Sequence, residues 1–112
     1  MSELGQRMLK ADVLQREWMF TLRMSTEEAV GIASEESLLV QGAVDCCFEE
    51  GGGWILLDYK TDRADDIDAL IDRYQPQLAL YAKAIERITG KPVRETWLCL
   101  LTAGEAYLIG QA

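Results

Sequence analysis

Several residue types that build common functional sites are absent or scarce in this chain of 112 residues. It contains no histidine, and its three cysteines, Cys46, Cys47 and Cys99, show no CxxC spacing. Structural zinc ions and iron–sulfur clusters are held by sets of such ligands, so neither is expected within the chain. Cys46 and Cys47 are neighbours that would face opposite sides of a strand, so we expect reduced, buried thiols of the kind found in cytoplasmic proteins.

Positive charge and long apolar segments are also scarce. Acidic residues outnumber basic residues by 19 to 11, which gives a net charge of −8. Proteins that coat nucleic acid are usually basic, so this composition counts against simple wrapping of DNA. The sequence has no apolar run of membrane-spanning length, no signal-peptide pattern and no glycine-rich phosphate loop. We therefore expect no membrane partner and no ATP site in this chain.

The residues that are present predict one folded α/β domain over residues 1–112. Hydrophobic residues make up 49% of the chain, enough for a modest core. Their periodicity predicts a helix from about Ser2 to Gln15, a strand around Trp18 to Leu22, and a solvated connection from Thr26 to Glu36. Val40 to Asp62 follows as a two-stranded hairpin with a glycine turn.

The second half of the chain returns from helix to strand. Helical spacing begins at Ile67, and Pro76 predicts a break near Gln75, because proline lacks a backbone N–H. A second helix would then run from Pro76 and end at Gly90. Two strands follow, over Val93–Thr102 and Ala106–Ile109. This order predicts a central mixed sheet, mainly an antiparallel meander, flanked by helices.

Two carboxylates and a lysine meet on one face of the predicted hairpin. If Gly51 and Gly52 form the turn, antiparallel pairing places Asp45 directly across from Asp58. Their Cβ atoms would then lie about 5 Å apart, where like charges are destabilising. Lys60 follows Asp58 by two residues and so points to the same face. This arrangement requires a cation between the acids.

Two interpretations of this cluster are open on the residues alone. In the first, Asp45, Asp58 and the carbonyl oxygen of Tyr59 hold a hard divalent cation, Mg²⁺ or Mn²⁺, and Lys60 orients or activates an attacking water. Such a set suits hydrolysis of a phosphodiester. In the second, Asp45 and Lys60 form an ion pair on a solvated sheet face, which would contribute little to stability.

Three short motifs occur in order along the chain. They are Gln41 to Asp45 (QGAVD), Leu57 to Asp62 (LDYKTD) and Gln77 to Tyr81 (QLALY), in motif form GxxD, DYKT and QxxxY. Together they resemble the PD-(D/E)xK nucleases of the RecB type. The surrounding residues look most like the C-terminal nuclease domain of AddA-type subunits of bacterial helicase–nucleases, and residues 16–20 (REWMF) resemble the RExPF-like strand start of that family. Each motif alone is weak, but three in order are specific.

The resemblance implies a fold, an activity and partners. The fold would be a restriction-endonuclease-like core. The activity would be that of a Mg²⁺-dependent exodeoxyribonuclease domain within an ATP-dependent helicase–nuclease of double-strand-break repair and recombination, in the bacterial cytoplasm. Its partners would be DNA, helicase domains of the same parent chain and an AddB-like subunit. Two other functions stay open: a non-catalytic, DNA-holding scaffold with a degenerate nuclease fold, and a free-standing RecB-like exonuclease.

The resemblance also implies roles for single residues. Asp45 and Asp58 would be metal ligands together with the backbone carbonyl of Tyr59, and Lys60 would be the catalytic lysine. RecB-type nucleases also carry a metal-binding histidine on a helix upstream of the GxxD strand, whereas this chain has none. Either that histidine lies before residue 1, which the abrupt N-terminus favours, or this member of the family lacks it. In the first case we expect the chain to be a truncated piece that binds metal weakly, is inactive alone and can form a homodimer through exposed apolar surface. The chain also lacks the cysteine cluster of the iron–sulfur members, which favours the AddA-type family.

The QxxxY motif has two interpretations. Gln77 and Tyr81 lie one helical turn apart, and the resemblance places them beside the active site, supporting it or contacting DNA. Alternatively, Tyr81 is a core residue, and Gln77 caps a helix or hydrogen-bonds to the backbone. Thr61 is expected to bond backbone or a DNA phosphate, and Glu17 to be structural. Basic residues later in the chain are candidates for phosphate contacts, although a solvated helix face is the commoner explanation of such charges: Lys83, Arg87, Lys91 and Arg94.

Overall fold

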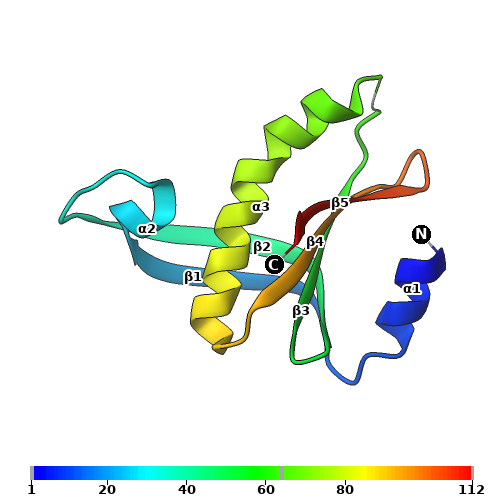
Figure 1. The fold of residues 1–112 in the computed structure, drawn as a ribbon, viewed down its shortest axis with the longest axis horizontal. Coiled ribbons are helices and arrows are strands. Elements are labelled where there is room, and N and C mark those ends of the chain that lie inside the picture. The colour runs from blue at the N-terminus through cyan, green and yellow to red at the C-terminus, as the bar shows by residue number, and fades with distance from the viewer. Residues whose placement is uncertain (1, 64, 112) are drawn as a thin grey trace.

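A computed structural model describes residues 2–63 and 65–111 of the chain (Figure 1). The elements are α1 (Ser2–Leu9), β1 (Leu14–Ser25), α2 (Thr26–Val30), β2 (Ser37–Glu50), β3 (Gly53–Lys60), α3 (Ile67–Thr89), β4 (Val93–Leu100) and β5 (Glu105–Gln111). The strands form one sheet of order β1-β2-β3-β4-β5, in which β3 and β4 are parallel and the other neighbours antiparallel. The predicted α/β class, a mixed sheet flanked by helices, is confirmed.

Helix α3 connects the two parallel strands and packs across one face of the sheet (Figure 1). A parallel pair requires a long crossover connection of this kind. The buried Leu70, Leu78 and Ile85 recur at helical spacing on α3. They share a core cluster with Leu56 of β3 and Leu98 of β4. No described helix has the length and apolar character that crossing a membrane requires.

Helix α1 covers the opposite face of the sheet. Its Leu4 is buried against Phe48, in a second cluster separate from the α3 side. Arg7 fixes the helix in place, because its guanidinium pairs with Glu50 at 2.7 Å and with Glu95 at 2.8 Å. The strands at the centre of the sheet are therefore enclosed between α3 and α1, which explains why the hairpin strand β3 is buried along most of its length.

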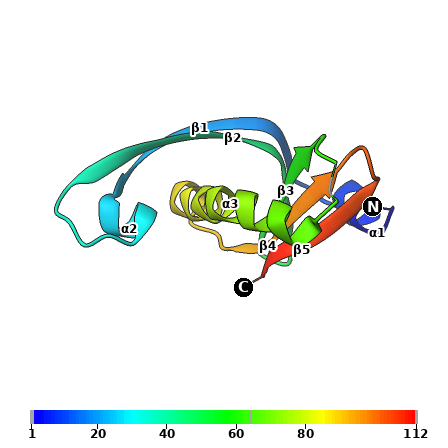
Figure 2. The ribbon, with the colours of Figure 1, turned by 90° about the horizontal axis from the view of Figure 1, so that it is seen from above.

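Strands β1 and β2 continue beyond the rest of the sheet as a long arm. Their pairing runs without a change of register from Leu14↔Phe48 to Ser25↔Ser37. Figure 2 shows this arm curving over α3, with α2 at its far end. The inner face of the arm contributes Phe20 to the α3 core. Its ring packs edge to face against Tyr81 of α3, with ring centroids 5.3 Å apart.

The arm approaches α3 closely at Gly42, the glycine of the GxxD motif. A Cβ atom built at Gly42 would lie 2.6 Å from Cε1 of Tyr81 and 2.9 Å from Cζ of Phe20. Gly42→Ala should therefore lower the free energy of unfolding by about 1–3 kcal/mol, the usual cost of overpacking, as measured by urea titration. Gly5→Ala is the matched control, because nothing lies within 4 Å of a Cβ there. Equal stability of Gly42→Ala and the parent would contradict this packing.

The predicted N-terminal helix is wrong over its second half. Helix α1 ends at Leu9, and Leu14 already belongs to β1, where it pairs with Phe48. Ladder pairing with β2 has overridden the loose apolar stripe that suggested a longer helix. The segment predicted as a solvated connection contains the short helix α2, which Ser25 caps by accepting the backbone N–H of Glu28.

The predicted break at Pro76 is also wrong, because α3 is one helix from Ile67 to Thr89. Pro76 lies on the exposed side, where water can satisfy the carbonyl group that has lost its N–H partner. Leu70 before it and Leu78 after it are buried in the same core, so packing holds both halves on one axis. The predicted end of the helix at Gly90 is confirmed, with that glycine in the left-handed conformation at φ 73°.

Candidate active site

The acid pair lies where β2 separates from β3. Their pairing runs from Glu50↔Gly53 to Cys46↔Leu57, so Asp45 and Asp58 are the next residues on the two strands. This is the register predicted from the glycine turn. No further ladder pair follows, since β2 leaves with β1 toward the arm while β3 continues beside β4. In its place, Oδ2 of Asp45 accepts the backbone N–H of Tyr59 at 2.7 Å.

Asp58 is buried and only partly compensated. Asp58 is 6% exposed, and its carboxylate oxygen Oδ2 has no hydrogen-bond partner among the described residues. Nζ of Lys60 lies 3.2 Å from that oxygen, close enough for an ion pair but outside hydrogen-bond geometry. Burial, followed by the nearby Asp45 carboxylate, raises the pKa of Asp58 to about 6, and Lys60 only partly offsets this. Lys60 therefore does not fully compensate the negative charge of the two carboxylates, and a bound cation would stabilise them further.

Lys60 is held between Asp58 and an aromatic ring. Its Nζ lies 4.4 Å from the ring centroid of Tyr74, a cation–π distance. The Tyr74 hydroxyl in turn donates to Asp62 at 3.1 Å. The alternative of an Asp45–Lys60 pair on a solvated face is therefore wrong, because the lysine pairs with the buried Asp58 instead. The contact of Tyr74 with Lys60 was not predicted from the sequence, because Tyr74 has the same spacing as the other apolar residues of its helix.

The donor atoms fit a small, hard cation. Backbone N–H and C=O of one strand residue point to the same side, so the Tyr59 carbonyl faces the Asp45 side where its N–H is bonded. The next carbonyl, that of Lys60, points the other way and accepts the N–H of Leu101 at 2.9 Å. Nowhere in residues 2–63 and 65–111 do three acidic or cysteine side chains gather as a metal cluster. A Mg²⁺ ion nevertheless usually keeps several waters and needs only one or two protein carboxylates, so two carboxylates and a carbonyl are enough protein ligands.

The QxxxY pair lies farther along α3, under the arm. Nε2 of Gln77 donates to the Tyr81 hydroxyl at 3.2 Å, and the Tyr81 ring packs on Phe20. These contacts support the core interpretation of Tyr81 and place Gln77 on the exposed side of the helix. A DNA contact by either residue stays a prediction. The backbone carbonyl of Thr61 accepts a hydrogen bond from the hydroxyl of Thr102 at 3.0 Å.

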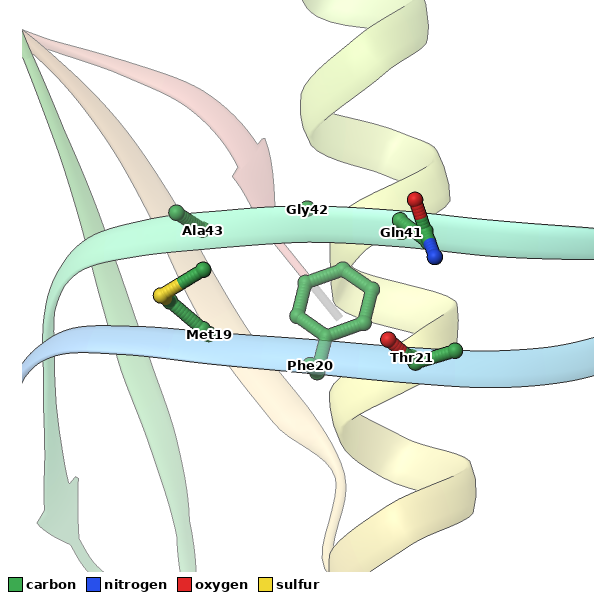
Figure 3. Close-up of a pocket in the computed structure, with 6 residues that line it drawn as sticks. All are labelled: Met19, Phe20, Thr21, Gln41, Gly42 and Ala43. Carbon is green, nitrogen blue, oxygen red and sulfur yellow. The ribbon is translucent and has the colours of Figure 1, made fainter.

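Among the described residues, two of the pockets are lined by residues of β1 and β2 on this arm and near its base. One, of 370 Å³, lies beside the acid pair and is lined by Arg16, Glu17, Asp45, Cys46 and Tyr59. From the sequence, Arg16 is noted only as part of the REWMF segment and is given no role in the site, and Glu17 is expected to be structural. The other, of 410 Å³, lies between the same two strands farther along the arm, and Figure 3 shows its lining: Met19, Phe20, Thr21, Gln41, Gly42 and Ala43. Its lining carries no ionisable group, so it offers no comparable chemistry.

Comparison with known proteins places the chain in a family. The model of the family described as the PD-(D/E)XK nuclease superfamily matches residues 2–111. The chain belongs to this superfamily. The resemblance of its three motifs is therefore confirmed at the level of the family, and the mixed sheet flanked by helices is consistent with the restriction-endonuclease-like fold.

Three similar curated proteins are each named as the A-type subunit of an ATP-dependent helicase/nuclease. The chain is 47% identical over 104 residues to that of Alkaliphilus metalliredigens (strain QYMF), covering 88% of this chain and 9% of the relative. It is 41% identical over 106 residues to that of Clostridium botulinum (strain 657 / Type Ba4), covering 90% and 8%. The protein of Alkaliphilus oremlandii (strain OhILAs) is 47% identical over 104 residues, with coverage of 88% and 9%. The chain thus spans less than a tenth of the length of these relatives.

Proposed function

We propose that this PD-(D/E)XK superfamily chain is a divalent-metal-dependent deoxyribonuclease domain that hydrolyses DNA phosphodiester bonds. The observation that carries the proposal is the buried Asp58 carboxylate, set beside Asp45 with an oxygen that lacks a hydrogen-bond partner and with Lys60 at 3.2 Å. Two acids held together at a cost to the folded state are expected where a cation binds.

Asp45, Asp58 and the Tyr59 carbonyl would hold Mg²⁺ or Mn²⁺. Such an ion, when bound, lowers the pKa of a coordinated water and stabilises negative charge on a phosphate oxygen. The N–H of Tyr59 fixes the Asp45 carboxylate by one oxygen and leaves its other oxygen for a ligand. The buried position of Asp58 restricts its rotation, so both carboxylates are preorganised before any ligand arrives.

Lys60 would be the catalytic lysine. Asp58 and the Tyr74 ring hold its ammonium group at the edge of the site. From there it can orient the attacking water and neutralise charge that develops on the phosphate during hydrolysis. Its side chain is 24% exposed, so it keeps access to a strand that enters from solvent.

The similarity to the A-type helicase/nuclease proteins supports a wider proposal. Residues 1–112 would form one nuclease domain, acting as an exonuclease within an ATP-dependent helicase–nuclease of DNA repair and recombination in the bacterial cytoplasm. DNA strands would be delivered by helicase domains of the same parent chain, and the partner protein would be an AddB-like subunit. Gln77, Tyr81 and Thr61 would support the site or contact the strand.

Metal binding tests the proposal without requiring turnover. Calorimetric titration with Mn²⁺ should detect one site, and Asp45→Ala should weaken it by at least about 100-fold, since even second-shell changes cost 10- to 100-fold. Asp68→Ala is the charge-matched control, because Asp68 is exposed in the first turn of α3. Equal Mn²⁺ affinity in the parent and in Asp45→Ala would favour a non-catalytic, DNA-holding module instead.

A further inference from the structure

The pocket of 370 Å³ beside the acid pair contains charged groups that the proposed hydrolysis does not use. Its lining combines Asp45 and Tyr59 of the proposed metal site with Arg16 and Glu17 of β1. A volume in this range is typical of sites for small ligands or single residues of a polymer. Whatever enters this pocket therefore lies next to the proposed cation and touches β1 as well.

A backbone distortion brings both β1 residues to this pocket. Neighbours in a regular strand face opposite sides, so Arg16 and Glu17 would normally be separated by the sheet. Glu17, however, has φ 49° and is the one residue in the described chain, glycines aside, with a positive φ. It lies opposite Asp45, at the one gap in an otherwise unbroken β1–β2 register. Such a conformation costs on the order of 1 kcal/mol and is found most often at functional sites.

Arg16 is free to bind a ligand. It is exposed, and it makes no ion pair within 4 Å among the described residues. Arg87 and Lys91, by contrast, are engaged, because Arg87 pairs with Glu28 and Lys91 pairs with Glu49. Arg16 pairs with Cys46 in the β1–β2 ladder and lines the same pocket as Tyr59, which places it beside the proposed metal site.

We propose that Arg16 is a positioning residue that binds a phosphate group of the DNA strand next to the phosphate being cleaved. The inference rests on the proposed nuclease function. It adds that the guanidinium of Arg16 fixes the position of the DNA strand along the active site. A guanidinium can donate two parallel hydrogen bonds to phosphate oxygens, which fixes orientation as well as position. The carboxylates of Glu17 and Asp45 in the same pocket repel phosphate, so tight binding also requires the divalent cation.

The test is DNA binding by the 112-residue chain in Ca²⁺, with a single-stranded thymidine octanucleotide as the probe. Arg16→Gln should raise Kd about 10-fold and lower the slope of log Kd against log salt concentration by about 0.7, the change expected when one phosphate contact to a single strand is lost. Arg16→Lys should keep the slope and recover part of the affinity. Arg23→Gln is the matched control, because Arg23 is exposed on the same strand and hydrogen-bonds Ser37 away from the pocket.

Three results would overturn the assignment of Arg16. The first is an equal Kd and salt slope for Arg16→Gln and Arg23→Gln. The second is loss of Mn²⁺ affinity in Arg16→Gln together with loss of DNA binding, since that would make Arg16 a structural support of the metal site. The third is a parent chain that does not bind the octanucleotide. Each is distinguishable from failure of the nuclease proposal, which is decided by cleavage and metal binding in variants of Asp58 and Asp45.

Discussion

Replacing Lys60 with methionine should reduce the rate of DNA cleavage by about 10²- to 10³-fold, the usual effect of removing one group that stabilises transition-state charge. The ammonium group lies 3.2 Å from Asp58 and over the Tyr74 ring, so methionine removes its charge while it retains much of the packing. Single-turnover cleavage of a labelled strand at saturating Mg²⁺ measures the effect. The appropriate enzyme for the assay is the full-length helicase–nuclease that we propose carries this domain.

The pH of this assay matters because Lys60 lowers the pKa of Asp58. Without the lysine, Asp58 holds its proton to a higher pH, and metal binding weakens near neutrality. Cleavage is therefore compared at about pH 8.5, where the carboxylate is ionised in both proteins. Lys10→Met, at an exposed position after α1, is the control and should cleave at the parental rate. A rate for Lys60→Met within twofold of the parent would rule out a catalytic role.

Replacing Asp58 with asparagine should make the metal-free chain more stable while it removes metal binding. The pKa of Asp58 is about 6 in the folded chain and 3.8 in its ordinary state, so the folded state binds this proton more tightly. The free energy of unfolding therefore falls as the pH rises from about 4 to about 6, and the full penalty is present above that range. Asparagine does not ionise, so Asp58→Asn should gain about 1–3 kcal/mol near pH 8.

Urea titrations at two pH values measure this gain. The difference between Asp58→Asn and the parent should vanish near pH 3.5, where the parental carboxyl group is also neutral. Asp72→Asn removes one negative charge at an exposed position of α3 and should show no such difference. A variant Asp58→Asn that is less stable than the parent at pH 8 would contradict the view that function is maintained here at the expense of stability.

The central hairpin was predictable because its geometry is local. Two glycines set the turn, the turn sets the register, and the register places Asp45 opposite Asp58 without reference to the rest of the chain. The end of α3 at Gly90 was predictable for the same reason, since a left-handed residue ends a helix by itself. The break predicted at Pro76 was wrong because tertiary packing on both sides of the proline outweighs a local preference.

The surroundings of the acid pair could not be predicted in this way. Tyr74 reaches Lys60 only because the first turns of α3 cross the end of β3. Arg16 and its neighbour Glu17 line one pocket because β1 is distorted at Glu17, and no residue type at that position signals a positive φ. These contacts depend on how distant elements are placed relative to one another, which periodicity does not specify.

The central claim is that the Asp45–Asp58 pair is the centre at which DNA is cut. Its most direct test is to measure cleavage and unwinding together in the full-length helicase–nuclease proposed to carry this domain, with and without Asp58→Ala. We predict that Mg²⁺-dependent cleavage is lost, while ATP-dependent unwinding, which needs no residue of this site, continues at the parental rate. Undiminished cleavage by the Asp58→Ala enzyme would contradict the claim.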